Sequence, residues 1–193
     1  MNRTLKKLVL TEYKRLFTLI IIFVISLILS ALIFILVGQV NITNMNYESI
    51  SQLSFNIIFL RTLKRNLIYF LAVICLTCIG QSKIINCMFG LISVFYGLSV
   101  IYLIKTMQYD KIYFLFTFID YLIFFPILFY FTYISSVISK YTKRTKKIET
   151  ISHKFDIIVS SYIKLSFIYL LIVTVYSFGY SYYITILSRL LVK

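Results

Sequence analysis

Two charged residues inside otherwise apolar segments are the side chains whose chemistry is most informative. Asp120 lies in the apolar segment 112–138, and Lys164 lies in the apolar segment 157–178. A charge at the centre of a bilayer costs at least about 2.5–3.5 kcal/mol, so such residues usually face protein or water. If the two segments are antiparallel helices that rise about 1.5 Å per residue, the depths of Asp120 and Lys164 in the membrane differ by several ångströms. An ion pair between them could then form. The alternative is that Lys164 extends to one interface while Asp120 sits near the other.

The cysteines and the histidine are the next residues that could do chemistry. Cys75 and Cys78 form a C-x-x-C motif. Redox and metal-binding cysteines need an accessible, electropositive setting, whereas these two lie in an apolar segment and are expected to line a helix contact. His153, the sequence's single histidine, lies in a basic loop, so a His-based metal cluster is excluded. Since glycine-rich phosphate-binding motifs are also absent, we predict no cofactor, no metal ion, no catalytic residue and no enzymatic activity.

The composition explains why these residues stand in apolar segments. Of the 193 residues, 61% are hydrophobic and 13% are charged, whereas soluble domains carry roughly 45–50% apolar residues. These values exclude an ordinary soluble enzyme and a disordered chain. Lysine and arginine number 20 against 6 acidic residues. In so apolar a chain, this excess is typical of the sorting of loops across a bilayer and not of nucleic-acid binding.

We predict an all-α fold, a polytopic integral membrane bundle of five transmembrane helices in one membrane domain covering residues 1–193. A spanning helix needs roughly 20 mostly apolar residues. The predicted spans are residues 17–37, 67–82, 87–104, 112–138 and 157–178. Residues 181–193 either extend the last span or lie along the interface. The stretches between spans are shorter than a domain of roughly 50 residues, so any activity must lie between helices or belong to a partner.

The distribution of positive charge predicts a cytoplasmic N-terminus and an external C-terminus. With this orientation the inner segments carry twelve Lys and Arg residues and the outer segments seven, in agreement with the positive-inside rule. The densest basic run consists of Lys140, Lys143, Arg144, Lys146 and Lys147. We interpret it as a cytoplasmic anchor, and clusters of about 4–8 basic residues beside a span also attract anionic lipids. Membrane lipids are therefore a predicted partner.

Small residues and one proline predict where the helices approach one another. Ser26 and Ser30 form a small-x-x-x-small pair in the first span, and Gly90 and Gly97 lie seven positions apart in the third. Such residues allow close approach of two backbones. Pro126, the single proline, lies within the fourth span. It removes one backbone hydrogen bond there and should kink the helix.

Several features between the second and fourth spans carry a family resemblance. They are the basic-Asn entry Lys64-Arg65-Asn66, the turn glycine Gly80, and the third-span glycines Gly90 and Gly97. With these features residues 60–140 resemble the stage II sporulation protein M family. The fourth span of many members opens with Pro-His-Gly, then a glutamate, then a proline. In this chain only that proline, Pro126, is kept, and Asp120 stands where the histidine would be.

The resemblance implies a multi-pass protein of the bacterial cell membrane that acts in engulfment of the forespore during sporulation. Family members anchor and localise a complex with two peptidoglycan-degrading partners, and they act as a scaffold and not as the hydrolase. For this chain the resemblance implies peptidoglycan hydrolases as partners, and a homo-oligomer is compatible with that role. We predict that four residues shape helix packing or a partner groove: Asn66, Asp120, Pro126 and Lys164.

The alternative function is the permease subunit of a small exporter. Residues 10–17, Leu-Thr-Glu-Tyr-Lys-Arg-Leu-Phe, resemble the interfacial entry of ABC-2-type permeases, which work with a separate ATPase. Such permeases usually have six spans and a cytoplasmic C-terminus, so five spans with an external C-terminus would count against this function. A membrane-bound lipid enzyme ranks last, because no acid–base cluster is in reach.

Overall fold

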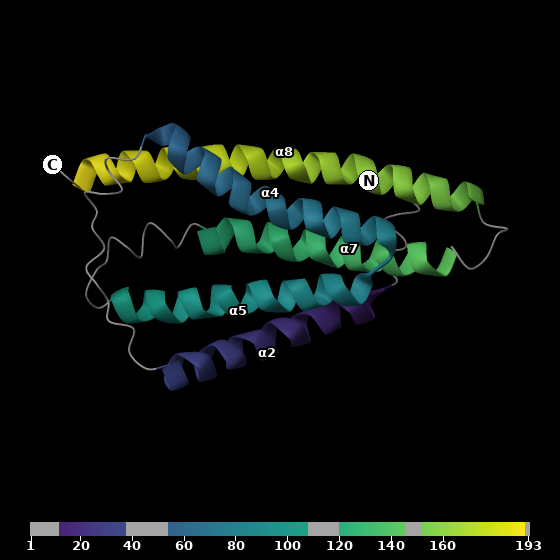
Figure 1. Cartoon of the computed structure of the whole chain (residues 1–193), viewed down its shortest axis with the longest axis horizontal. Helices are drawn as coiled ribbons and strands as arrows, with labels where there is room; N and C mark the ends of the chain where they lie inside the picture. The colour runs from purple at the N-terminus through teal and green to yellow at the C-terminus, as the bar shows by residue number, and fades with distance from the viewer. Residues whose placement is uncertain (1–11, 38–53, 108–119, 146–151, 192–193) are drawn as a thin grey trace.

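The computed structural model describes residues 12–37, 54–107, 120–145 and 152–191 (Figure 1). Within these ranges the chain forms five α-helices and one π-helical turn. The helices are α2 (Tyr13–Val37), α4 (Phe55–Ile79), α5 (Ser82–Met107), α7 (Phe125–Thr145) and α8 (Ser152–Leu191), and the π-helical turn η1 (Asp120–Phe124) precedes α7. The predicted all-helical class is confirmed for the described residues.

All five α-helices contain a stretch that is long and apolar enough to cross a membrane. The stretches are residues 13–36, 55–79, 82–101, 122–142 and 158–187, and each overlaps one of the predicted spans. Five helices of the spanning type therefore agree with the expectation from the sequence. The sidedness of the two termini stays a prediction.

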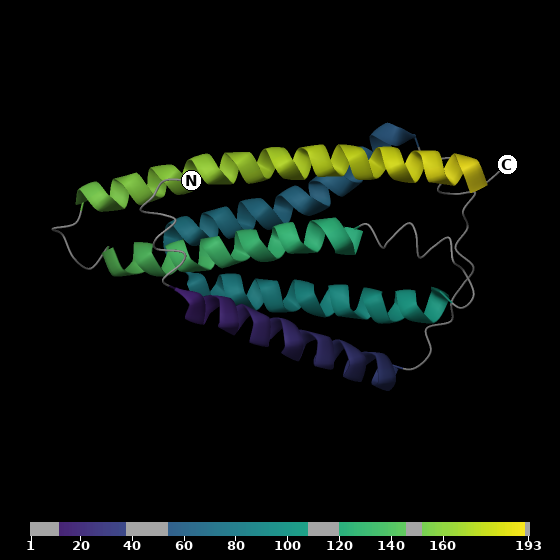
Figure 2. The same cartoon turned by 180° about the vertical axis from the view of Figure 1, so that it is seen from behind.

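Consecutive helices run antiparallel, and α7 lies in the middle of the bundle (Figure 1 and Figure 2). On one side of α7 lie α5 and α2, and on the other side lie α4 and α8. The main helix pairs are α2 with α5, α4 with α8, α4 with α7 and α5 with α7. We call the end of the bundle at which α2, α5 and α8 begin the proximal end, and the opposite end the distal end.

A two-residue turn joins α4 to α5 at the proximal end. Gly80 adopts a left-handed conformation with φ of 87° and ψ of 26°, which a glycine tolerates because it has no Cβ. Its N–H donates to the carbonyl of Thr77 over 3.1 Å, and the N–H of Gln81 donates to that of Leu76 over 2.9 Å. These bonds satisfy carbonyls that the end of a helix otherwise leaves free. The turn therefore sets α4 and α5 antiparallel.

The helix over the second predicted span begins earlier than the sequence suggested. α4 starts twelve residues before position 67, so residues 55–66, which the predicted spans left between the first two helices, belong to a helix. The charged side chains of Arg61, Lys64 and Arg65 are exposed. The buried positions recur every three or four residues, as on one face of a helix: Ile58, Thr62, Asn66 and Tyr69. Charges confined to one side thus allow a helix where a count of apolar residues predicted a loop.

The last helix is much longer than its predicted span. α8 has 40 residues, which corresponds to roughly 60 Å at about 1.5 Å per residue. The hydrocarbon core of a bilayer is about 30 Å thick, so α8 must extend beyond it or tilt. Residues 181–191, for which extension and an interfacial position were both open, continue α8 without a break.

Aromatic side chains fill the interior where α4, α7 and α8 meet. Phe70 of α4, Phe131 of α7 and Tyr162 of α8 are fully buried. The ring of Phe131 lies 4.7 Å from that of Phe70 and 4.9 Å from that of Tyr169. Ring pairs at such distances attract one another beyond the effect of burial alone. The three helices are therefore joined through rings, with α7 at the centre.

Candidate functional site

Among the described helices, the central helix α7 carries more buried serine and threonine side chains than any other. All nine residues from 131 to 139 are buried. The buried serine and threonine residues of α7 are Thr132, Ser135, Ser136, Ser139 and Thr142. A buried polar group without a partner is costly in a low-dielectric interior. The partners of Thr132, Ser135 and Ser136 define two polar clusters, one within the bundle and one at the proximal end.

Tyr162 connects three helices through its hydroxyl group. The hydroxyls of Ser135 and Tyr162 lie 2.8 Å apart, and Tyr162 donates to Oγ1 of Thr77 in α4 over 3.1 Å. Because a tyrosine hydroxyl has one proton, Ser135 is the donor to Tyr162. A further bond of 2.7 Å joins the hydroxyls of Tyr69 in α4 and Thr132 in α7. These bonds fix the register of α4, α7 and α8.

A charged cluster lies at the proximal end, where the start of α2 meets α7. Glu12 accepts two hydrogen bonds from Nζ of Lys140, of 2.9 and 3.1 Å. The same carboxylate lies 3.7 Å from Nε of Arg15. The side chains of Lys140 and Glu12 are 29% and 25% exposed. Solvent therefore screens the pair in part, and its contribution to stability is about 1 kcal/mol or less.

Arg15 extends this cluster to the hydroxyl residues of α7. Its Nη1 donates to the backbone carbonyl of Ser136 over 2.8 Å and to the hydroxyl of the same residue over 3.0 Å. The hydroxyl of Ser136 donates in turn to Oδ1 of Asn86 in α5 over 2.9 Å. We call Glu12, Arg15, Asn86, Ser136 and Lys140 the Glu12 network. It ties α2, α5 and α7 together at the proximal end.

The helices α2 and α5 approach each other closely through small side chains. Ser26 donates to the carbonyl of Gly90 over 3.1 Å, and Ser30 donates to that of Val94 over 2.9 Å. A Cβ added at Gly97 would overlap the side chain of Ser30, so the missing side chain permits the short distance between the helices. The predicted close approach at these serines and glycines is confirmed.

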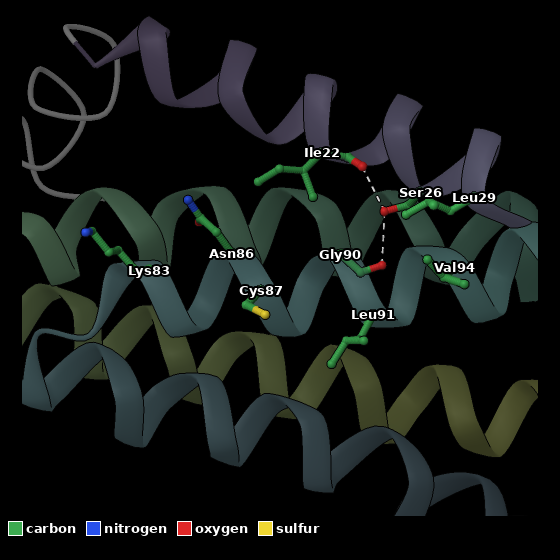
Figure 3. A pocket seen from close by; sticks show the side chains of 9 residues that line it. All are labelled: Ile22, Ser26, Leu29, Lys83, Asn86, Cys87, Gly90, Leu91 and Val94. Carbon is green, nitrogen blue, oxygen red and sulfur yellow. Dashed lines mark hydrogen bonds between the residues drawn. The ribbon is translucent and has the colours of Figure 1, made fainter.

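An open groove of about 460 Å³ lies along the α2–α5 contact (Figure 3). Three residues of α2 line it, namely Ile22, Ser26 and Leu29. On α5, Lys83 and Asn86 lie at the proximal end of the groove, whereas Leu91 and Val94 lie toward its other end (Figure 3). The groove is therefore polar at one end and apolar along the rest of its length.

Asn66, one of the four residues predicted to shape packing, lies at the contact of α4 with α8. Its side chain is 2% exposed, and its Nδ2 donates to the hydroxyl of Ser177 over 3.2 Å. Its Oδ1 accepts a bond of 3.1 Å from Nε of Arg65. The position of Asn66 agrees with a role in helix packing, whereas a role in a partner groove stays a prediction.

The two charged residues that could have paired lie far apart along the bundle axis. Tyr162 of α8 and Ser135 of α7 lie at the same level along the bundle axis, because their hydroxyls are hydrogen-bonded. From that level Asp120 is fifteen residues away toward the distal end, and Lys164 is two residues away in the same direction. At about 1.5 Å per residue the axial separation is about 20 Å, which exceeds the reach of a lysine stem. The structure therefore favours the alternative in which the exposed Lys164 extends to an interface; the side chain of Asp120 lies outside the described residues.

Pro126 is the second residue of α7, directly after the π-helical turn η1. A proline donates no N–H and crowds the carbonyl four residues before it. A wider π-helical turn is one way in which a helix accommodates such a position. The irregularity predicted at Pro126 thus takes the form of η1, while the proline ring itself is exposed.

The predicted basic anchor is described only in part. Lys140 belongs to the Glu12 network, where its ammonium group is bonded to a carboxylate. Lys143 and Arg144 continue α7 with side chains outside the described residues, and Lys146 and Lys147 lie outside them altogether. An anchoring or lipid-binding role of this run stays a prediction, and Lys140 would have to leave its carboxylate to serve it.

The C-x-x-C motif is not part of a helix contact. Cys75 and Cys78 are both exposed on α4, so the expectation of a shared helix interface is wrong. The buried face of α4 at this level carries Val73 and Thr77, which turns the two cysteines outward. Among the residues that the structure describes, His, Cys, Asp and Glu form no group that could hold a metal ion.

Asn86 and Ser136 of the Glu12 network were not predicted from the sequence, and Glu12 was included only within residues 10–17, without a partner. One signal was present, because Glu12 is the single acidic residue before and within the first predicted span. A lone carboxylate at the start of an apolar helix, in a chain rich in basic residues, is expected to find a cation. Its actual partner, Lys140, is 128 residues away in the sequence, and spacing could not identify it.

Comparisons with known proteins identified no relative of the chain. No protein-family model, no curated protein and no solved structure matches the chain. The function is therefore argued from the geometry and from the sequence resemblance alone.

Proposed function

We propose that the protein is a multi-pass membrane scaffold that anchors and localises a peptidoglycan-remodelling complex during forespore engulfment. The outward face of α2 carries the scaffold part of this proposal. α2 packs on α5 and α7, and 17% of its apolar stretch is buried. Large aliphatic side chains remain exposed on it, among them Val24, Ile28, Leu32 and Leu36. The engulfment part rests on the resemblance of residues 60–140 to the stage II sporulation protein M family.

The internal bonding of the bundle supports a scaffold. The hydroxyls around Tyr162 bond to one another, and the Glu12 network holds α2 against α5 and α7. Helices in a bilayer associate through shape and van der Waals contact and not through a hydrophobic driving force. A helix held in a fixed position offers such a surface with little reorganisation on binding. α2 is therefore the helix on which we place the partner.

Membrane embedding with a cytoplasmic N-terminus is the first part to test. In a Cys75→Ala, Cys87→Ala background, the exposed Cys78 reports the proximal end and Ser54→Cys reports the distal end. An impermeant maleimide should label the Ser54→Cys site in intact cells, whereas Cys78 should react only after lysis. Release of the chain by an alkaline carbonate wash would contradict the embedding, and the reverse labelling pattern would contradict the orientation.

The partner is tested by site-specific photocross-linking in the native host. A benzophenone side chain at Ile28 samples the outward face of α2, and one at Leu171 samples the exposed face of α8 as the matched control. We expect peptidoglycan hydrolases, secreted or membrane-anchored, in the adducts from position 28 and not in those from position 171. Adducts with lipid alone at both positions would contradict the scaffold function.

A permease subunit is the second candidate, and the Glu12 network favours it. Glu12 and Arg15 belong to the stretch 10–17 that resembles the entry of ABC-2-type permeases, and both bond toward α7 at the proximal end. In an exporter, motion of the ATPase would have to pass through a connection of this kind. Recovery of a cytoplasmic ATPase by the same cross-linker placed at the exposed Lys14, at the proximal end of α2, would support the permease and contradict the scaffold.

A further inference from the structure

The groove between α2 and α5 has its polar groups at one end and carbon along the rest. Lys83 is exposed in the second position of α5, and Asn86 follows one helical turn later. Beyond them the lining is aliphatic, with Ile22 and Leu29 from α2 and Leu91 from α5 (Figure 3). The open groove has a volume of about 460 Å³, within the range of about 300–1,000 Å³ that small-molecule sites occupy.

The polar end of the groove attracts a negative charge. Lys83 supplies a cation that the hydrogen bonds of the described residues leave unused, and α5 begins at Ser82, so the positive end of its helix dipole lies beside it. Asn86 accepts from Ser136 through Oδ1, which leaves its amide group as a donor. The ammonium group of Lys83 and the amide group of Asn86 are therefore both available as donors to an anion.

The remaining polar group along the groove is closed to a ligand. The single proton of the Ser26 hydroxyl is shared between the carbonyls of Ile22, at 2.8 Å, and Gly90, at 3.1 Å (Figure 3). Its hydrogen-bonding capacity is therefore directed into the α2–α5 contact. An occupant of this part of the groove meets carbon and needs no polar atoms of its own.

From these observations we infer that the α2–α5 groove binds one anionic phospholipid. The phosphate lies at Lys83 and Asn86, and an acyl chain follows Ile22, Leu29 and Leu91 toward the middle of the membrane. Charge complementarity selects the headgroup, and the aliphatic lining accepts the chain. The site differs from Lys140 of the basic run, because Lys83 has no carboxylate partner among the described residues and lies at a groove. It rests on the proposed membrane embedding but not on the scaffold role.

Native mass spectrometry of the full chain, released from nanodiscs, tests the headgroup part. The nanodiscs contain equimolar phosphatidylglycerol and phosphatidylcholine with the same acyl chains. We expect one phosphatidylglycerol retained on the native chain and about fivefold less on Lys83→Gln, since one lysine near a membrane surface contributes about 1 kcal/mol. The matched control is Lys164→Gln, which removes an exposed lysine of α8 and should leave the retained lipid unchanged. Equal retention on the native chain and Lys83→Gln would overturn the assignment.

The acyl-chain part has its own pair of variants. Cys87 lies exposed in the groove, and Cys75 lies exposed on α4 away from it. Cys87→Phe fills the groove with an apolar ring and should reduce the retained phosphatidylglycerol severalfold, whereas Cys75→Phe should not. Loss in both variants, or retention in both, would overturn the site.

A dimer without lipid in the native spectrum would show that a second copy of the chain occupies the groove instead, and that outcome also overturns the proposal. A chain that fails the carbonate test is not membrane-embedded, which separates failure of the embedding from failure of this site.

Discussion

The two sides of the bundle are held together by different chemistry. Between α2 and α5 the contact consists of small residues, and serine hydroxyls donate across it to backbone carbonyls. Between α4, α7 and α8 it consists of large rings and of hydroxyls that bond to each other. The first contact depends on the absence of atoms, so added atoms should disrupt it. The second depends on particular atoms being present, so their removal should weaken it.

The largest effect is expected from adding a side chain to the α2–α5 contact. Gly97→Leu places its Cβ on Ser30 and should force the helices apart, lowering the free energy of unfolding by about 3 kcal/mol, the upper end of the usual cost of overpacking. The measurement is denaturant unfolding of the purified protein in detergent. Gly179→Leu is the matched control, because a Cβ there meets nothing within 4 Å and the change in helix propensity is the same. Equal unfolding free energies for the two variants would show that the contact is not built on missing atoms.

The α2–α5 contact is also the part of the structure that the sequence predicted best. Small residues four and seven positions apart are visible in a single chain, and their effect, a short distance between backbones, follows from their size. The sequence did not indicate which helix would be the partner of Ser26 and Ser30. Their carbonyl partners belong to residues 64 positions further along the chain, a distance over which spacing carries no information.

The second effect is expected from removing a hydroxyl on the other side of the bundle. Tyr162→Phe keeps the buried ring but deletes the oxygen between Ser135 and Thr77. We expect a loss of about 1–1.7 kcal/mol, near the largest values found for single side-chain hydrogen bonds inside membranes. The same unfolding measurement applies, with Tyr182→Phe as the control at an exposed tyrosine of α8. If Tyr162→Phe unfolds like the control, ring packing alone holds this side together.

Sequence patterns failed where helical geometry sets which side chains meet. The start of α4 was misplaced because a count of apolar residues treats Arg61, Lys64 and Arg65 as a loop, although a helix can hold all three on one exposed side. Cys75 and Cys78 were misplaced for the related reason that residues of an apolar segment need not face a neighbour. The depth estimate for Asp120 and Lys164 failed because it counted the two residues from opposite ends of their spans, whereas the bond between Tyr162 and Ser135 sets how α8 lies along α7.

The third effect concerns the Glu12 network, which joins the two sides at α7. A double-mutant cycle with Glu12→Gln and Lys140→Gln should give a coupling energy of about 0.5–1 kcal/mol at low salt, because the pair is partly exposed. Added salt should reduce the coupling by screening. A cycle of Glu12→Gln with Lys64→Gln, an exposed lysine of α4, serves as the control and should give none. A coupling that persists unchanged in high salt would mean that the pair is more deeply buried than its side-chain exposure indicates.

The smallest effect is expected from the pair that the sequence suggested. Because Asp120 and Lys164 are separated by about 20 Å along the bundle axis, the changes in unfolding free energy of Asp120→Asn and Lys164→Gln should add to within about 0.5 kcal/mol in the double variant. This absence of coupling is the counterpart of the cycle at Glu12 and Lys140, where two opposite charges meet within hydrogen-bond distance. If the double variant is instead clearly better tolerated than the sum of the two single variants, the charges attract each other inside the bundle. α8 would then have to slide along α7 and break the bond between Tyr162 and Ser135. The Tyr162→Phe variant should in that case lose no stability, so the two experiments check each other.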